Sequence, residues 1–233
     1  MEAVIENKPL ENNNKKELAL FRAGFINFFI AEIFLIVSTL SRATIISGVP
    51  RIFALLSTFT FVAYVLFTVS SFLLRNLNDY FRKSLYAIAI FDVVTFVYNI
   101  CQTSTDGFFL SIGRGLYWSG SFIMCIYYVH FFFGMSEFFK KYNFNKAHKR
   151  SSLAVVIFVI FFIGETVFEY LSTTKLVLTN AFANRFFLYG SWGFEFLLYT
   201  SIFVVTILAM NYVNKHIPHE KKGKKKKDEK VSK

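Results

Sequence analysis

The chain has 233 residues, of which 55% are hydrophobic and 20% aromatic, and its formal net charge is +11. Phenylalanine alone accounts for 32 positions, whereas proline accounts for 3. This composition excludes an ordinary soluble protein, because so much apolar surface needs a non-aqueous environment. The two cysteines, Cys101 and Cys125, are too few for a disulfide framework. The sequence therefore predicts a protein of the lipid bilayer.

In chain order, residues 1–17 are polar, and no cleavage site follows the first apolar run, so we predict an uncleaved cytoplasmic segment. Residues 18–214 contain six apolar runs, each close to the roughly 20 residues that a spanning helix needs. The runs do not alternate as barrel strands do, which leaves helices as the spanning structure. We predict an all-α polytopic membrane helix bundle of six transmembrane helices, paired as three antiparallel hairpins. The predicted spans cover residues 23–40, 52–74, 84–101, 116–136, 152–171 and 186–210.

The distribution of lysine and arginine predicts the orientation. Of the 26 basic residues, 21 fall before the first span, in the second and fourth connections, or in the lysine-rich tail, residues 215–233. Cytoplasmic loops retain positive charge, so both termini are expected in the cytoplasm. The same basic loops and tail are expected to contact anionic lipid headgroups rather than nucleic acid, with a protein partner as the alternative.

Ionisable residues within the spans are the candidate functional residues, because a charge at bilayer depth costs at least about 2.5 kcal/mol. Glu32 and Glu195 fall near the predicted midplane, Asp92 slightly toward the inside, and Glu165 in the outer half. Glu165 shares a helix face with Glu169, four residues later. A ligand or proton pathway is one interpretation of these acids. The other is that each acid only bonds to a neighbouring helix and holds the bundle together.

His130 is the only histidine within a predicted span and completes the candidate pathway. It could act in acid–base chemistry, although a packed histidine is the simpler interpretation. The chain contains no HxxxH or HExxH pair, and haem ligation would need a second intramembrane histidine. We therefore predict neither a metal site nor a cofactor.

Arg51, Arg114 and Arg185 each open a span on the predicted outer side. Interfacial anchoring explains them most simply, and capture of an anionic substrate is the alternative. There is no GxSxG elbow, phosphate-binding glycine loop or CxxC pair, so an enzyme is not favoured. A lipid-modifying enzyme that uses His130 and Glu137, with Asp92 as a further candidate, is a distant alternative.

Two hypotheses follow for a multi-pass protein of the cell membrane or, alternatively, of an organelle membrane. In the first, the protein binds or transports a small molecule, an ion or protons, and the intramembrane acids line a polar interior. In the second, it is a non-catalytic subunit or regulator that recruits a partner through its basic cytoplasmic face.

Overall fold

The computed structural model of the chain describes residues 12–44, 50–104, 106–174 and 178–216. Within these ranges every regular element is an α-helix and there is no strand. The helices are α1 (Asn12–Thr44), α2 (Pro50–Leu74), α3 (Asp79–Gln102), α4 (Gly107–Lys141), α5 (Asn145–Ser172) and α7 (Ala181–His216). The predicted all-α class is confirmed, and the helices extend beyond the predicted spans at most ends.

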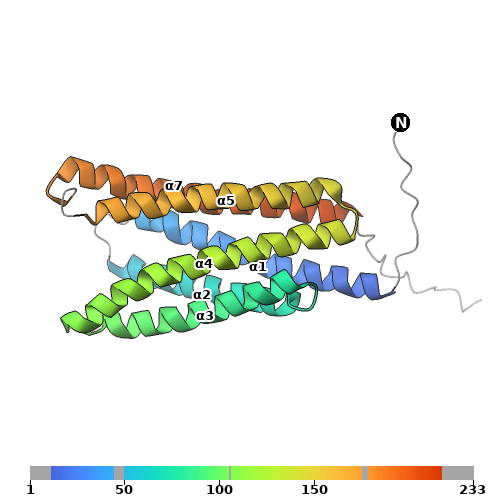
Figure 1. The fold of residues 1–233 in the computed structure, drawn as a ribbon, viewed down its shortest axis with the longest axis horizontal. Coiled ribbons are helices and arrows are strands. Elements are labelled where there is room, and N and C mark those ends of the chain that lie inside the picture. Colours follow the sequence, from blue (N-terminus) through green and yellow to red (C-terminus); the bar gives the residue numbers. More distant parts are fainter. Residues whose placement is uncertain (1–11, 45–49, 105, 175–177, 217–233) are drawn as a thin grey trace, which may run out of the picture.

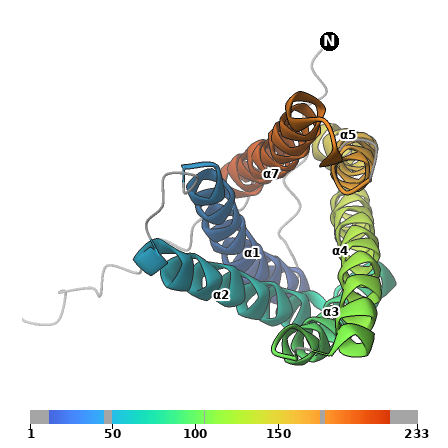
Figure 2. The ribbon, with the colours of Figure 1, turned by 90° about the vertical axis from the view of Figure 1, so that its left-hand side faces the viewer.

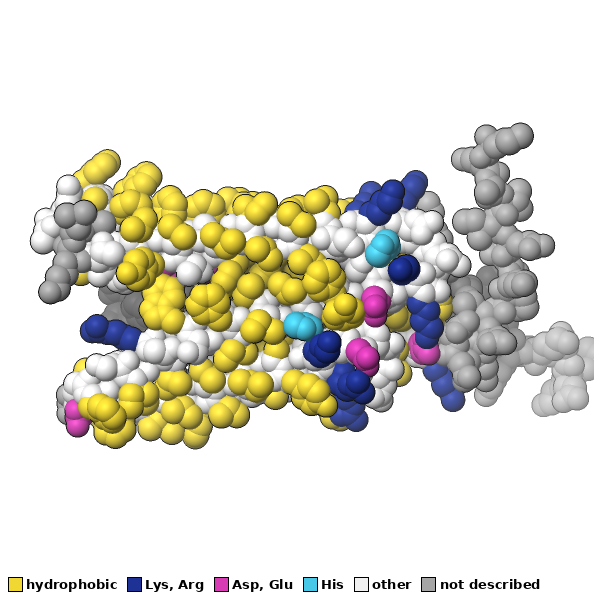
Figure 3. Space-filling view, in the orientation of Figure 1, with side chains coloured by type: hydrophobic (Ala, Val, Ile, Leu, Met, Phe, Trp, Pro, Cys, Tyr) yellow, Lys and Arg dark blue, Asp and Glu magenta, His cyan; other side chains and the backbone are white. Residues whose placement is uncertain are grey.

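Five of the helices are long and apolar enough to cross a membrane. The sixth, α2, contributes a shorter apolar stretch, Phe59–Leu74, where its side chains are described. Large apolar side chains cover the outside of the bundle, as Figure 3 shows, and Phe96 and Ile160 are among those at least 60% exposed. Water would not favour such a surface, whereas lipid tails would. The protein is a helical membrane bundle.

Consecutive helices pack as three hairpins, and the hairpins close into a ring. The most extensive contacts join α1 to α2, α3 to α4, and α5 to α7, which confirms the predicted pairing. Further contacts join α2 to α3, α4 to α5, and α7 back to α1. Figure 2 looks along this ring, with α1 and α4 on opposite sides. The two helices can therefore meet only through side chains that reach into the interior.

The two ends of the ring differ in charge. The α2–α3 and α4–α5 turns lie at one end, where α1 begins and α7 ends (Figure 1). Lysine and arginine side chains concentrate there in Figure 3, and we call it the basic end. The described basic residues of its turns and adjoining helix ends are Arg75, Arg82, Lys83, Lys140, Lys141, Lys146, Lys149 and Arg150. The positive-inside rule predicts that this end faces the cytoplasm.

Stacked aromatic rings fill the interior toward the basic end. Phe21 of α1 stacks on Phe138 of α4 with centroids 4.0 Å apart, and Phe28 stacks on Phe131 at the same distance. Phe81 of α3 meets the edge of the Phe131 ring at 5.4 Å. We call these five residues and Phe25 the aromatic core; all are at most 2% exposed. The two stacked pairs connect α1 with α4, which lie on opposite sides of the ring.

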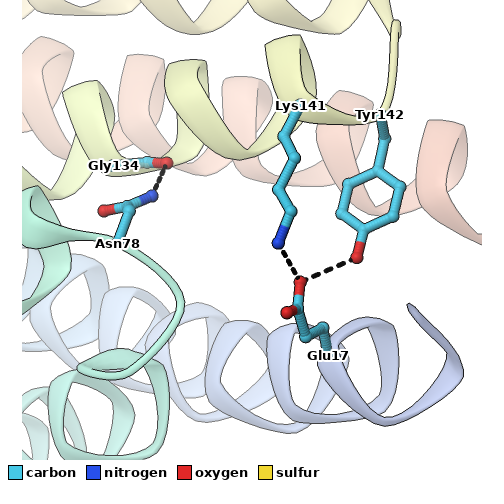
Figure 4. A network of polar contacts seen from close by, with 5 residues as sticks. All are labelled: Glu17, Asn78, Gly134, Lys141 and Tyr142. Atoms are coloured by element: carbon cyan, nitrogen blue, oxygen red, sulfur yellow. Dashed lines mark hydrogen bonds and ion pairs between the residues drawn. The ribbon is translucent and has the colours of Figure 1, made fainter. Parts of the chain in front are cut away.

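Hydrogen bonds between helices stabilise the basic end (Figure 4). Glu17 of α1 accepts hydrogen bonds from Lys141 Nζ at 2.5 Å and from the Tyr142 hydroxyl at 2.9 Å. Asn78 caps α3, since its Oδ1 accepts from the Phe81 backbone N–H, and its Nδ2 donates to the Gly134 carbonyl at 2.8 Å. Together these contacts join α1, α3 and α4 at the basic end.

Candidate ligand-binding cavity

A cavity of about 250 Å³ occupies the interior on the other side of the aromatic core. Its described lining comes from α2, α3, α4, α5 and α7. It runs from Tyr117 and Glu169, near the end of the bundle opposite the basic end, to Tyr128 and Phe158, midway along their helices. We call that opposite end the cavity end. Tyr117, at the cavity end of this lining, is 41% exposed, so the cavity is bordered there by a residue that reaches the protein surface.

Three carboxylates from two helices line this cavity. Glu165 and Glu169 lie one turn apart on α5, and Glu195 reaches the cavity from α7. Glu195 is buried, with 6% of its surface exposed. The Tyr117 hydroxyl of α4 donates a short hydrogen bond to Glu169 and thereby links α4 to α5 across the cavity wall. The described lining contains no lysine, arginine or histidine.

Aromatic side chains form much of the remaining wall. Tyr98 of α3 and Tyr117 of α4 face each other with ring centroids 6.0 Å apart. Tyr64 of α2 meets Phe91 of α3 edge to face at 4.8 Å. Trp192 contributes from α7. The cavity therefore combines carboxylates with tyrosine, tryptophan and phenylalanine rings.

A fourth carboxyl group lies behind the inner end of the cavity. Glu32 of α1 is completely buried, and its Oε1 accepts a 2.7 Å hydrogen bond from the hydroxyl of Tyr128, whose ring lines the cavity. Its second oxygen, Oε2, is buried without a hydrogen-bond partner. A buried polar atom without a hydrogen-bond partner is unusual in a native protein interior. Tyr128, which bonds the other oxygen of Glu32, lies between this carboxyl group and the cavity.

The remaining candidates from the sequence lie elsewhere. Asp92 of α3 is half-buried against α2, where it accepts a 2.9 Å hydrogen bond from Thr68. His130 is partly exposed on α4, with its Nδ1 2.8 Å from the Ile126 carbonyl and its ring 6.2 Å from that of Tyr80. Neither residue is part of the described cavity lining. The structure thus brings Glu165 and Glu195 together, with Glu32 adjacent, and leaves Asp92 and His130 apart.

Two arginines considered for anion capture, Arg114 and Arg185, are exposed and lie outside the described lining. The Arg51 side chain and the lysine-rich tail fall outside the described residues. Sequence reasoning did not select Glu169 as a site residue, although its four-residue spacing from Glu165 was the available signal. Nothing in the sequence singled out Tyr117 or Trp192 as cavity residues.

The cavity brings carboxylates and aromatic rings into one space. Among the described residues, no group of three or more histidine, cysteine, aspartate or glutamate side chains is arranged to hold a metal ion. No protein-family model, curated protein or solved structure matches this chain. Function must therefore be argued from the cavity itself.

Proposed function

We propose that the protein binds a small polar molecule in the cavity and acts as a membrane transporter or as the ligand-binding subunit of one. The observation that carries the proposal is the group of Glu165, Glu169 and Glu195 in one intramembrane cavity. Acidic side chains inside a membrane are costly, and where they occur they usually mark a substrate or ion pathway.

The size of the cavity limits the ligand. Pockets for drug-sized ligands commonly measure about 300–1,000 Å³. The cavity, at about 250 Å³, lies just below that range, so its ligand is expected to contain few non-hydrogen atoms. Protons or small inorganic cations could also load such a site.

The asymmetry of the interior supports a direction of entry. The aromatic core fills the ring toward the basic end, whereas the cavity reaches the surface at the other end. With the basic end in the cytoplasm, as the charge distribution predicts, a ligand would enter from the outside of a cell membrane. Transport would then require the aromatic core to open.

Thermal unfolding of the purified protein with a panel of small cationic, anionic and neutral compounds tests the proposal. A bound ligand raises the melting temperature, because at a concentration of 100 times its Kd it adds about 2.7 kcal/mol to the free energy of unfolding. We expect one charge class to stabilise the wild type and Glu137→Gln, an exposed control on α4 outside the cavity lining, but not Glu195→Gln.

A panel in which no compound separates the wild type from Glu195→Gln would contradict the proposal. Flux of a stabilising compound, or of protons, into proteoliposomes would then distinguish a transporter from a binding subunit. The double variant Glu165→Gln, Glu195→Gln should abolish that flux.

The second candidate is a regulator or subunit that recruits a partner through the basic end. The clustering of basic side chains around the α2–α3 and α4–α5 turns favours it. Replacement of Lys146, Lys149 and Arg150 by glutamine should then abolish capture of an acidic protein partner while ligand stabilisation persists. The two candidates are compatible, because they use opposite ends of the bundle.

A further inference from the structure

We infer that the cavity is a binding site for a small organic cation, such as a protonated amine or a quaternary ammonium ion. The inference rests on the proposed function and narrows its ligand class. It follows from the pairing of negative charge with aromatic faces in one cavity, and from the finding that no three acidic residues among those described are arranged to hold a metal ion.

The carboxylates provide the charge selection. Glu165, Glu169 and Glu195 line the cavity from the neighbouring helices α5 and α7, so they concentrate negative charge on its wall. Low-dielectric walls strengthen and focus such a field, which attracts a cation and repels an anion. An anionic ligand would have to be held without any described basic residue in the lining.

The aromatic rings favour an organic cation over an inorganic one. Tryptophan is the best cation–π partner, followed by tyrosine, when the cation lies within about 6 Å of the ring centroid. Trp192, Tyr98 and Tyr117 supply such rings beside the carboxylates. Aromatic cages of this kind are used to recognise quaternary ammonium groups, whose charge is spread over methyl groups and weakly hydrated.

The spacing of the acids argues against a bare metal ion. A divalent ion needs several oxygen ligands at about 2.0–2.6 Å. The described acidic residues form no group of three that could hold one, although three of them line the same cavity. Carboxylates that share a cavity but do not converge on a point suit a larger cation.

Glu32 adds a buried carboxyl group beside the inner end of the cavity, bonded to the lining residue Tyr128. Its Oε2 is completely buried and unpartnered, while its Oε1 is held by Tyr128 at the inner end of the cavity. Burying a carboxyl oxygen without a partner is unfavourable.

A native cysteine allows a direct test. Cys125 of α4 lines the cavity, whereas Cys101 is buried, so a Cys101→Ser protein carries one thiol at the site. Two methanethiosulfonate reagents of similar size, one bearing a trimethylammonioethyl group and one a sulfonatoethyl group, are applied outside oriented proteoliposomes. Each reagent forms a disulfide with the Cys125 thiolate and releases methanesulfinate. Each rate is divided by the rate of the same reagent with free 2-mercaptoethanol.

We expect the cationic reagent to react on the order of tenfold faster than the anionic one after this normalisation. The double variant Glu165→Gln, Glu195→Gln should bring the ratio to about one, whereas Glu137→Gln should leave it unchanged. A Cys125→Ser protein that retains Cys101 should not be labelled. A ratio at or below one in the wild type, or an unchanged ratio in the double variant, would overturn the inference.

The outcomes separate this inference from the proposed function. Equal labelling by both reagents leaves an accessible cavity but removes the selection for cations. Faster labelling by the anionic reagent supports the arginine-based capture of anions instead. Labelling by neither reagent, when the unfolded protein is labelled by both, contradicts an accessible cavity and overturns the proposed function as well.

A second measurement needs no acidic substitution and therefore does not depend on the folding of the variants. Choline and 3,3-dimethylbutan-1-ol have nearly the same shape, but only choline carries a positive charge. We expect choline, and not the alcohol, to slow the labelling of Cys125 by the neutral reagent methyl methanethiosulfonate. Equal protection by both compounds, or protection by the alcohol alone, would contradict a cation site.

Discussion

The two halves of the bundle interior use aromatic residues in opposite ways. Toward the basic end, the rings of α1 and α4 stack directly on one another with centroids 4.0 Å apart. Toward the cavity end, rings from α3, α4 and α7 border a space of about 250 Å³ together with three glutamates. The difference arises because none of the described residues of α1 lines the cavity. A six-helix ring is filled where one helix sends large side chains across it and hollow where none does.

The largest expected effect comes from removing one ring of the aromatic core. Phe28→Ala leaves a void among Phe67, Phe131 and Tyr128 and should lower the free energy of unfolding by about 3 kcal/mol. This value is at the low end for Phe→Ala, because lipid is as apolar as the core and only packing is lost. The same change at Phe162, which borders the cavity, should cost less than half as much.

Reversible unfolding in mixed micelles measures both values. Phe96→Ala, at a side chain that is 67% exposed, is the matched control and should change stability by no more than about 0.5 kcal/mol. Equal losses at Phe28 and Phe162 would contradict the division of the interior into a filled half and a hollow half.

A smaller effect is expected from adding a methyl group at a close contact between α4 and α3. A Cβ at Gly134 would lie 2.8 Å from the Phe81 ring, which is itself fixed within the aromatic core. Gly134→Ala should therefore destabilise the protein by about 1–3 kcal/mol through overpacking. Gly115 of the same helix has open space at that position, so Gly115→Ala should not destabilise it. Similar unfolding free energies for the two variants would show that the filled half is not tightly packed.

The sequence predicted the elements of the fold much better than the contents of its interior. Hydropathy located the six helices, and short connections identified the three hairpins, because span length and loop length constrain both. The helices extend beyond the predicted spans since polar residues such as Asp79 and Lys141 continue a helix outside lipid. In a chain with 32 phenylalanines, hydropathy could not separate Phe28, which is buried, from Phe96, which faces outward.

The candidate site could be predicted only in part, for a related reason. Depth along a helix can be counted from the sequence, but the direction in which a residue faces depends on how the helices pack. Glu195 and Asp92 both lie within predicted spans, yet one lines the cavity and the other bonds to Thr68 between α2 and α3. The aromatic part of the lining is assembled from five helices and carries no local motif.

Asn78 allows one interhelical hydrogen bond to be removed by itself. Asn78→Asp keeps the oxygen that accepts from the Phe81 N–H but loses the amide that donates to the Gly134 carbonyl. We expect a loss of about 1 kcal/mol in unfolding free energy, since the helix cap is retained. A loss above that of Gly134→Ala would mean that the turn, rather than the aromatic core, dominates the stability of this half.

The smallest effect is expected at the ion pair between Lys141 and Glu17. Both side chains are at least 32% exposed, so Lys141→Gln should cost no more than about 1 kcal/mol, and less at high salt. The Tyr142 hydroxyl also donates a hydrogen bond to Glu17 and should keep this contact in the variant. Burial and the hydrogen bond to that carboxylate raise the pKa of the Tyr142 hydroxyl above its ordinary value.

The sign of the pH dependence follows from that shift. A raised pKa in the folded state stabilises the protein fully below the unfolded pKa of about 10, and the contribution is lost as pH rises further. The unfolding free energy of Lys141→Gln should therefore fall more steeply above pH 10 than that of Lys141→Gln, Tyr142→Phe. Parallel curves for the two proteins would exclude the tyrosine from the contact. Neither substitution should alter the cavity end, because Glu17, Lys141 and Tyr142 lie on the other side of the aromatic core.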